Sequence, residues 1–86
     1  MVRVQGRMVR SSAFEGYQYN FRTNVFTVFF HDKTVGKYKN VPAWIFAAIE
    51  KIAEARDAGD MDASVGKYWI KEIKGKFEYV KVDSNA

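Results

Sequence analysis

Apolar and polar residues alternate over most of the first forty positions, and a two-residue period is typical of half-buried β-strands. Short polar stretches interrupt the alternation, as turns do. The stretch from Val25 to Phe30 contains only β-branched and aromatic residues, which favour strands. The pattern predicts a first strand followed by an antiparallel meander over residues 13–39. The four predicted strands cover residues 2–9, 14–21, 25–30 and 35–39.

The hydrophobic period changes from strand-like to helical at residue 40. Asn40 is a residue type that accepts hydrogen bonds from the first turn of a helix, and Pro42 suits an early helical position. The apolar residues that follow fall on one stripe until Gly59: Val41, Ile45, Ala48, Ile49, Ile52 and Ala55. We therefore expect a long amphipathic helix that is capped by Asn40 and lies across one face of the sheet.

A second helical pattern follows a polar loop. Apolar residues recur at helical steps between Gly66 and Gly75, which predicts a short helix there. Residues 77–82 then form a C-terminal strand, and residues 83–86 form a frayed tail. The predicted fold is a single α+β domain over residues 1–86. It consists of a small antiparallel β-meander packed against one long amphipathic helix, with a short second helix and a C-terminal strand.

Composition narrows the possible classes of protein. The chain has 86 residues, of which 48% are apolar and fourteen are Phe, Tyr or Trp, so one aromatic-rich core must supply nearly all its stability. It contains no cysteine, which excludes disulfides, thiolate metal sites and a cysteine nucleophile. No segment approaches the roughly 20 apolar residues of a membrane span, and the N-terminus lacks a signal-peptide pattern. We expect a cytoplasmic protein without membrane contact.

The net charge of +4 is distributed unevenly along the chain. Residues 1–40 carry seven basic and two acidic groups, residues 41–64 two basic and five acidic groups, and residues 65–86 five basic and three acidic groups. The three segments thus have net charges of +5, −3 and +2. Excess positive charge at both ends of the chain favours an anionic partner such as nucleic acid.

Two groups of residues are candidates for contact with RNA or single-stranded nucleic acid. Basic side chains neutralise phosphates, and exposed aromatic rings stack on unpaired bases. The first group combines an arginine of the turn after the second predicted strand with residues at the end of the fourth, and the second group lies on the short helix. Their members are Arg22, Lys37, Tyr38 and Lys39, and then Lys67, Lys71 and Lys74. The alternative interpretation is that Tyr38 belongs to the core and the lysines only solvate exposed faces.

No arrangement of residues in the sequence indicates catalysis or a bound cofactor. His31 is next to Asp32, which could orient it as a general base, but no nucleophile is placed beside the pair. Asp57, Asp60 and Asp62 lack the spacing and the closing glutamate of a calcium loop. We therefore predict no catalytic residue, no cofactor and no metal site, and interpret the acidic segment as a hydrated loop or as an acidic patch for a basic partner.

Two aromatic residues of the long helix suggest a different class of function. We expect Trp69 in the core, Trp44 partly exposed, and Phe46 projecting away from the core. Together with Asp57, Asp60 and Asp62, Trp44 and Phe46 could form a surface for another protein. The alternative function is therefore a protein–protein interaction module. The oligomeric state does not follow from the sequence.

Several segments together resemble a known domain family. They are Val9-Arg10-Ser11-Ser12, Gly16-Tyr17, Phe26 to Phe30, Tyr38 to Pro42, and Ala63 to Trp69 with Ile73. In this order and placement they resemble the KTSC domain, which occurs at the C-terminus of some lysyl-tRNA synthetases and as stand-alone small proteins of bacteria and phages. The likeness extends from residue 9 to about residue 77.

The resemblance implies a small binding module without an established enzymatic activity, for which RNA binding is the suggested role. It also implies a bacterial or phage protein, and a phage-encoded modulator of a host protein would fit the alternative function. The family's tyrosine-x-tyrosine motif falls on Gly36-Lys37-Tyr38, so glycine replaces the first tyrosine here. The acidic stretch from Asp57 to Asp62 looks longer than the usual connection.

Overall fold

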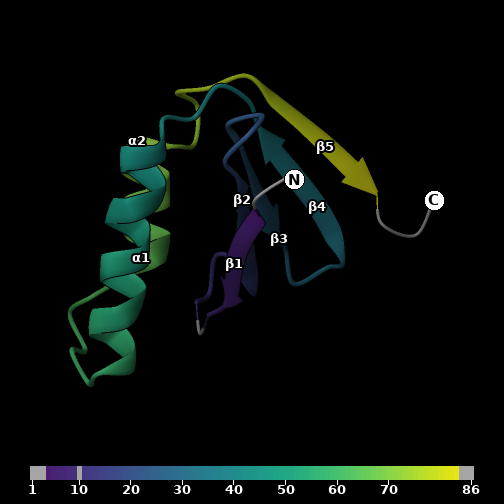
Figure 1. Cartoon of the computed structure of the whole chain (residues 1–86). Helices are drawn as coiled ribbons and strands as arrows, with labels where there is room; N and C mark the ends of the chain where they lie inside the picture. Colours follow the sequence, from purple (N-terminus) through teal and green to yellow (C-terminus); the bar gives the residue numbers. More distant parts are fainter. Residues whose placement is uncertain (1–3, 10, 84–86) are drawn as a thin grey trace.

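The computed structural model describes residues 4–9 and 11–83, which form five strands and two helices (Figure 1). The α+β prediction is confirmed. Asp83, which the sequence assigned to a frayed tail, is instead the last residue of a strand that pairs along its whole length, and the rest of the predicted tail, residues 84–86, lies outside the described residues. In chain order the elements are β1 (Val4–Met8), β2 (Gly16–Asn20), β3 (Val25–Phe29), β4 (Thr34–Tyr38), α1 (Ala43–Asp57), α2 (Val65–Glu72) and β5 (Tyr79–Asp83).

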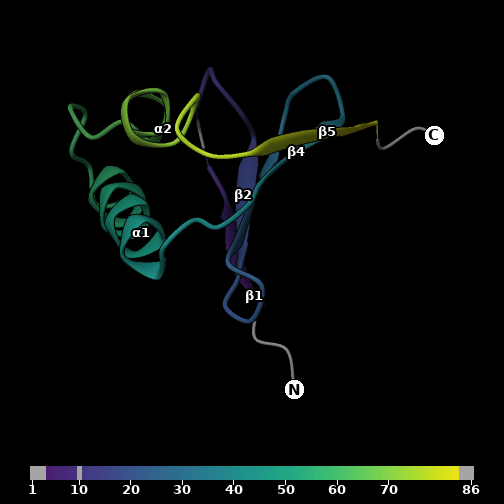
Figure 2. The same ribbon diagram turned by 90° about the horizontal axis from the view of Figure 1, so that it is seen from above.

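The five strands form one antiparallel sheet in the order β1-β2-β3-β4-β5. The first four strands are a meander, and β5 returns after both helices to pair with β4. Both helices lie against the same face of the sheet, and no helix of the described residues covers the other face (Figures 1 and 2). We call these the helix face and the outer face. Edges of the sheet remain at β1 and β5.

The long helix begins differently from the prediction. Asn40 has a φ of 60° and α1 begins at Ala43, so the expected capping role of Asn40 is wrong. Pro42 occupies the N-cap position, where its side chain cannot accept a hydrogen bond. Asparagine tolerates the left-handed conformation better than most residues. Asn40 therefore turns the chain from β4 toward α1 instead of capping the helix.

The core lies between the helix face of the sheet and the two helices. The central strands contribute four fully or almost fully buried side chains, Tyr17 and Tyr19 of β2 and Phe26 and Val28 of β3. Along each strand these buried residues alternate with residues that point to the outer face. The remaining core residues are Phe14, Tyr38, Val41, Ile45, Phe46, Ile49, Ala53, Val65, Trp69 and Ile73. Fourteen residues of one contiguous cluster thus hold both layers together.

Phe46 lies in this core, with 3% of its surface exposed, so the prediction that it projects from the core is wrong. Its ring stacks on Tyr19 with centroids 5.0 Å apart and contacts the edge of Tyr17 at 6.0 Å. Trp44, two residues earlier, is 64% exposed, as expected. Trp69 is buried, which confirms its predicted place.

Candidate nucleic-acid interface

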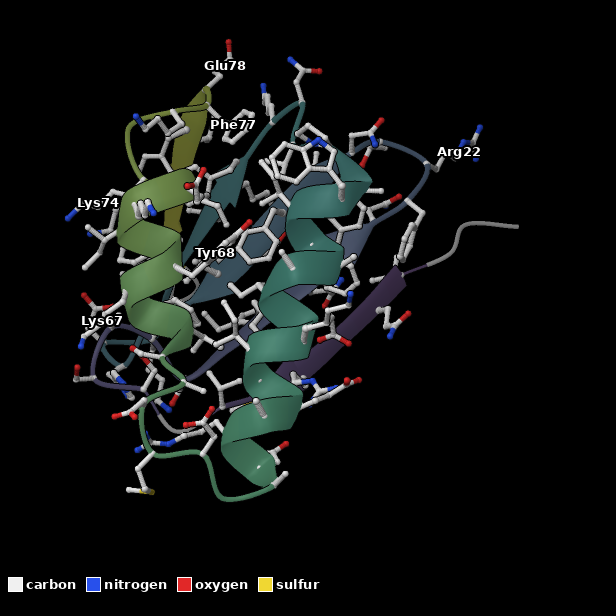
Figure 3. All side chains as sticks on the ribbon, turned by 90° about the vertical axis from the view of Figure 1, so that its left-hand side faces the viewer. Arg22, Lys67, Tyr68, Lys74, Phe77 and Glu78 are labelled. Carbon is white, nitrogen blue, oxygen red and sulfur yellow. The ribbon has the colours of Figure 1, made fainter. Side chains whose placement is uncertain are left out.

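The lysines of the second helix share one solvent-exposed face. The Ser64 side chain accepts a hydrogen bond from Lys67 N at 3.2 Å and so begins α2 with a satisfied cap. Val65, Gly66 and Trp69 are buried, while Lys67 and Lys71 are exposed one helical turn apart and the exposed Lys74 follows in the turn after α2. Figure 3 shows Lys67 and Lys74 on the side of α2 that faces away from α1.

This face has a local excess of positive charge. The segment from Val65 to Phe77 contains four lysines and one glutamate, a net charge of +3. The ion pairs found within residues 4–9 and 11–83 involve Arg7, Lys33 and Lys39, and none involves Lys67, Lys71, Lys74 or Lys76. Their ammonium groups are therefore available to an anionic partner. We call Lys67, Lys71, Lys74 and Lys76 the α2 lysine face.

Trp69 anchors α2 below this face. Its ring contacts the edge of Phe14 at 5.5 Å and that of Phe30 at 6.0 Å, and Lys74 Nζ lies 5.4 Å from its centroid. A cation–π contact at this distance restrains a lysine without neutralising its charge. A large buried ring thus fixes α2, which carries Lys67 and Lys71, to the sheet.

A cavity of about 280 Å³ adjoins the α2 lysine face at the start of the helix. The loop after β1, the end of α1 and the first turn of α2 surround it, and Ser12, Arg56 and Lys67 are among its polar lining residues. A Cβ atom at Gly66 would come within 3.0 Å of Ser11 Oγ, so glycine lets α2 approach the loop. Two segments that carry the KTSC resemblance therefore meet at this cavity, the first through Val9, Ser11 and Ser12 and the second through residues 63–67.

The other predicted basic group is dispersed. Lys37 alternates with the inward-facing Gly36 and Tyr38, so its side chain belongs to the outer face of the sheet. Lys39 Nζ is 3.2 Å from Glu78 Oε2. Arg22 lies in the turn after β2, on the side of the molecule opposite α2 (Figure 3). These side chains do not join the α2 lysine face into one surface.

Tyr38 has 3% of its surface exposed, so its ring cannot stack on a base. It lies 6.5 Å from the Trp69 ring and 4.8 Å from the Tyr79 ring, centroid to centroid, and burial raises its pKa. The interpretation that places Tyr38 in the core is the one that its burial supports. Because Tyr38 is not available for binding, the first predicted group consists only of basic side chains.

Gly36, which falls on the first tyrosine of the motif in the KTSC resemblance, lies beneath two aromatic rings. A Cβ atom built on Gly36 would be 2.6 Å from Tyr79 Cε1 and 2.9 Å from Phe30 Cε2. Tyr79 of β5 therefore packs directly over the glycine, next to Tyr38. In this chain, aromatic area at that position comes from the neighbouring strand.

The acidic segment does not converge on a single point. Asp57 Oδ2 accepts a hydrogen bond from Arg7 Nη1 at 3.2 Å, whereas Asp60 Oδ1 accepts one from the backbone N–H of Asp62 at 3.0 Å. Arg56 bonds to the backbone oxygen of Met61 at 2.8 Å and shapes the same loop. Within residues 4–9 and 11–83, no group of three or more potential ligand side chains could hold a metal ion.

Sequence reasoning missed a polar network that joins the first strand to the long helix. Glu50 of α1 accepts hydrogen bonds from Tyr17 Oη, from Arg7 Nε at 3.0 Å and from Gln5 Nε2 at 3.3 Å. Burial, and then the hydrogen bond to Glu50, raise the pKa of Tyr17, so the phenol remains a donor. The partners of Glu50 lie more than thirty positions away in the sequence, so no periodic pattern of residues could indicate these contacts. Because each group has partners, the network serves to hold β1 against α1.

His31 and Asp32 do not bond to each other but each stabilises a turn. The Nε2 atom of His31 is 2.7 Å from the backbone oxygen of Ser11, so it is the protonated nitrogen of the ring. Asp32 accepts hydrogen bonds from the backbone and the hydroxyl of Thr34, and the hydroxyl bond is the main reason that the pKa of Asp32 is lowered. Asp32 thereby organises the turn between β3 and β4, whereas His31 connects this turn to the loop after β1.

Comparison with known proteins identifies the fold. No protein-family model matches the chain, and no curated protein matches it significantly. Among solved structures, it is similar to the crystal structure of a KTSC domain protein from Yersinia pestis, with a TM-score of 0.72 and 21% sequence identity. The alignment covers 93% of this chain and 99% of the other. None of the helices within residues 4–9 and 11–83 is long and apolar enough to cross a membrane.

Proposed function

We propose that this KTSC-fold chain is a non-enzymatic binding module that holds RNA or another single-stranded nucleic acid on its α2 lysine face. The observation that supports the proposal is the exposure of Lys67 and Lys71 on α2 and of Lys74 in the turn after it, without ion pairs among the described residues. Such a role would place the protein in the cytoplasm of a bacterial cell or of a phage-infected host cell.

The geometry of the helix suits contacts with more than one phosphate. An α-helix rises about 1.5 Å per residue, so Lys67 and Lys71 are separated by about 6 Å along the axis, and Lys74 follows in the turn after α2. Neutralising phosphates releases counterions, which supplies binding free energy that does not depend on base sequence. Because Tyr38 is buried, we expect the lysines to contribute more than base stacking. Binding should therefore tolerate many sequences and weaken as salt rises.

Two double variants with the same change in net charge test which basic surface binds. Lys67→Glu with Lys71→Glu reverses charge on α2, whereas Lys37→Glu with Lys39→Glu reverses it on and beside β4. Fluorescence anisotropy with a short labelled RNA strand measures both affinities. We expect the α2 variant to lose at least about tenfold in affinity and the β4 variant to change by about twofold or less.

The opposite ranking would move the interface to β4, and equal losses would indicate only an effect of net charge. If the wild-type protein binds neither RNA nor single-stranded DNA at low salt, the proposed function is wrong. Circular dichroism of each variant separates lost binding from lost folding.

One observation favours the second candidate function, a protein–protein interaction module. Trp44 is 64% exposed on the first turn of α1, and an exposed tryptophan is a frequent anchor of protein interfaces. With Phe46 buried, the surface around Trp44 is smaller than the sequence suggested. Capture of one defined protein after nuclease treatment, lost in Trp44→Ala and retained in Lys67→Glu with Lys71→Glu, would support this candidate over nucleic acid.

A further inference from the structure

The outer face of the sheet is unusually apolar for a surface that no described helix covers. The outward parity of the five strands assigns seven apolar side chains to it: Val4, Met8, Val25, Phe29, Val35, Val80 and Val82. Among the described strand residues, Lys37 is the one whose side chain on this face is charged. An antiparallel sheet with one solvated face normally presents polar residues there, and exposed apolar surface often marks an interface.

The edge strand β1 has few of the features that usually prevent pairing with another strand. It contains neither lysine nor proline. Its only charged side chain, Arg7, lies on the helix face and donates a hydrogen bond to Glu50. Val4 and Met8 are 43% and 72% exposed on the outer side. β1 therefore offers an open row of backbone donors and acceptors beside an apolar surface.

The sequence of β1 is complementary to itself when two copies run antiparallel. With Gly6 opposite Gly6 of a second copy, Val4 lies opposite Met8 and Gln5 lies opposite Arg7. Apolar residues then face apolar residues, polar residues face polar ones, and the two Arg7 side chains do not oppose each other. An interface with two-fold symmetry requires this kind of self-complementarity.

The other edge of the sheet does not share this property. An antiparallel pair of β5 strands centred on their middle residue would place Lys81 opposite Lys81 of the second copy. Like charges directly opposite each other destabilise a strand pair. Charge complementarity thus selects β1 over β5 as the edge that can join two copies.

We propose that two copies of this chain associate through β1, antiparallel and centred on Gly6, so that their sheets join into one. The two-fold axis is perpendicular to the sheet, which keeps both outer faces on the same side and makes the apolar surface continuous from one copy to the other. The α2 helices lie away from this edge, so the association is independent of nucleic-acid binding.

Sedimentation equilibrium over a range of protein concentrations tests the proposal with two matched variants. Met8→Lys introduces a charge on β1, and Met61→Lys introduces the same charge in the loop after α1. The two methionines are 72% and 73% exposed, so neither change should disturb the folded monomer. We expect a concentration-dependent dimer for the wild type and for Met61→Lys, and at least tenfold weaker association for Met8→Lys.

A compensating variant tests the register. Val4→Glu combined with Met8→Lys places a glutamate of each copy opposite a lysine of the other in the proposed alignment, so it should recover most of the association lost in Met8→Lys alone. A wild type that is monomeric at every concentration, a Met8→Lys variant that dimerises normally, or a double variant without recovery would each overturn the proposal.

Discussion

At the scale of single residues, the aromatic side chains show where hydrophobic pattern is informative and where it is not. The stripe through Ile45 and Ile49 correctly predicts the buried side of α1. Phe46 and Ala53 are buried as well, because α1 contacts both the sheet and α2 and so buries a wider arc than one stripe. Ala48, Ile52 and Ala55 of the stripe are only half-buried, so the helical period marks one side of the buried arc and not its centre.

The burial of Phe46 has a measurable consequence for stability. Phe46→Ala removes a ring that contacts Tyr17, Tyr19 and Phe21, so we expect a loss of about 3–5 kcal/mol in the free energy of unfolding. Trp44→Ala, two positions away, removes an exposed ring and should cost about 0.5 kcal/mol or less. Urea denaturation measures both. Similar losses for the two variants would contradict the assignment of Phe46 to the core.

Gly36 illustrates a contact that no local pattern could reveal. The rings of Tyr79 and Phe30 fill the space beside it only because β5 pairs with β4 in one particular register. Residues 36 and 79 are distant in sequence, and the apolar parity within residues 77–82 is ambiguous. The sequence could indicate a missing tyrosine at position 36, but not which residue packs there.

At the scale of elements, the alternation and the helical periods predict every strand and helix with bounds that differ by a few residues from those observed. The alternation of apolar and polar residues could not predict which side of β1 faces the helices. Alternation groups Val4 with Met8 and Gln5 with Arg7, but it cannot say which group faces the helices. The structure directs Gln5 and Arg7 to α1, because Glu50 provides their partner there.

The network at Glu50 predicts a local effect on β1. Arg7→Ala removes charge-assisted hydrogen bonds to a carboxylate whose side chain is only 13% exposed, so we expect β1 to lose about 1–2 kcal/mol of local stability. Hydrogen exchange of the β1 amides should accelerate by about 5- to 30-fold, while exchange in β3 changes less.

Lys39→Ala is the matched control for this experiment. It removes an ion pair with Glu78 between side chains that are 49% and 66% exposed, which should have little effect on any strand. Unchanged exchange of β1 in Arg7→Ala would show that the network does not hold the strand in place.

At the scale of the whole molecule, folding separates basic residues that the sequence suggested might act together. The basic residues that the structure describes in the N-terminal segment are divided between the outer face, the turn after β2 and ion pairs with Glu15, Glu50 and Glu78. The α2 lysine face keeps its charge, since Lys67 and Lys71 lie one turn apart on α2 and Lys74 and Lys76 follow in the turn directly after it. The charge pattern of a short segment therefore predicts a charged surface better than the net charge of a long segment does.

The salt dependence of RNA binding tests the central claim most directly. For single strands, the logarithm of the binding constant falls against the logarithm of salt concentration with a slope of about −0.7 per phosphate neutralised. Replacing Lys67, Lys71 and Lys74 with glutamine should therefore make the slope less steep by about 2 while the protein stays folded. A slope that is the same in the wild type and the triple variant would contradict the claim that α2 binds the phosphates.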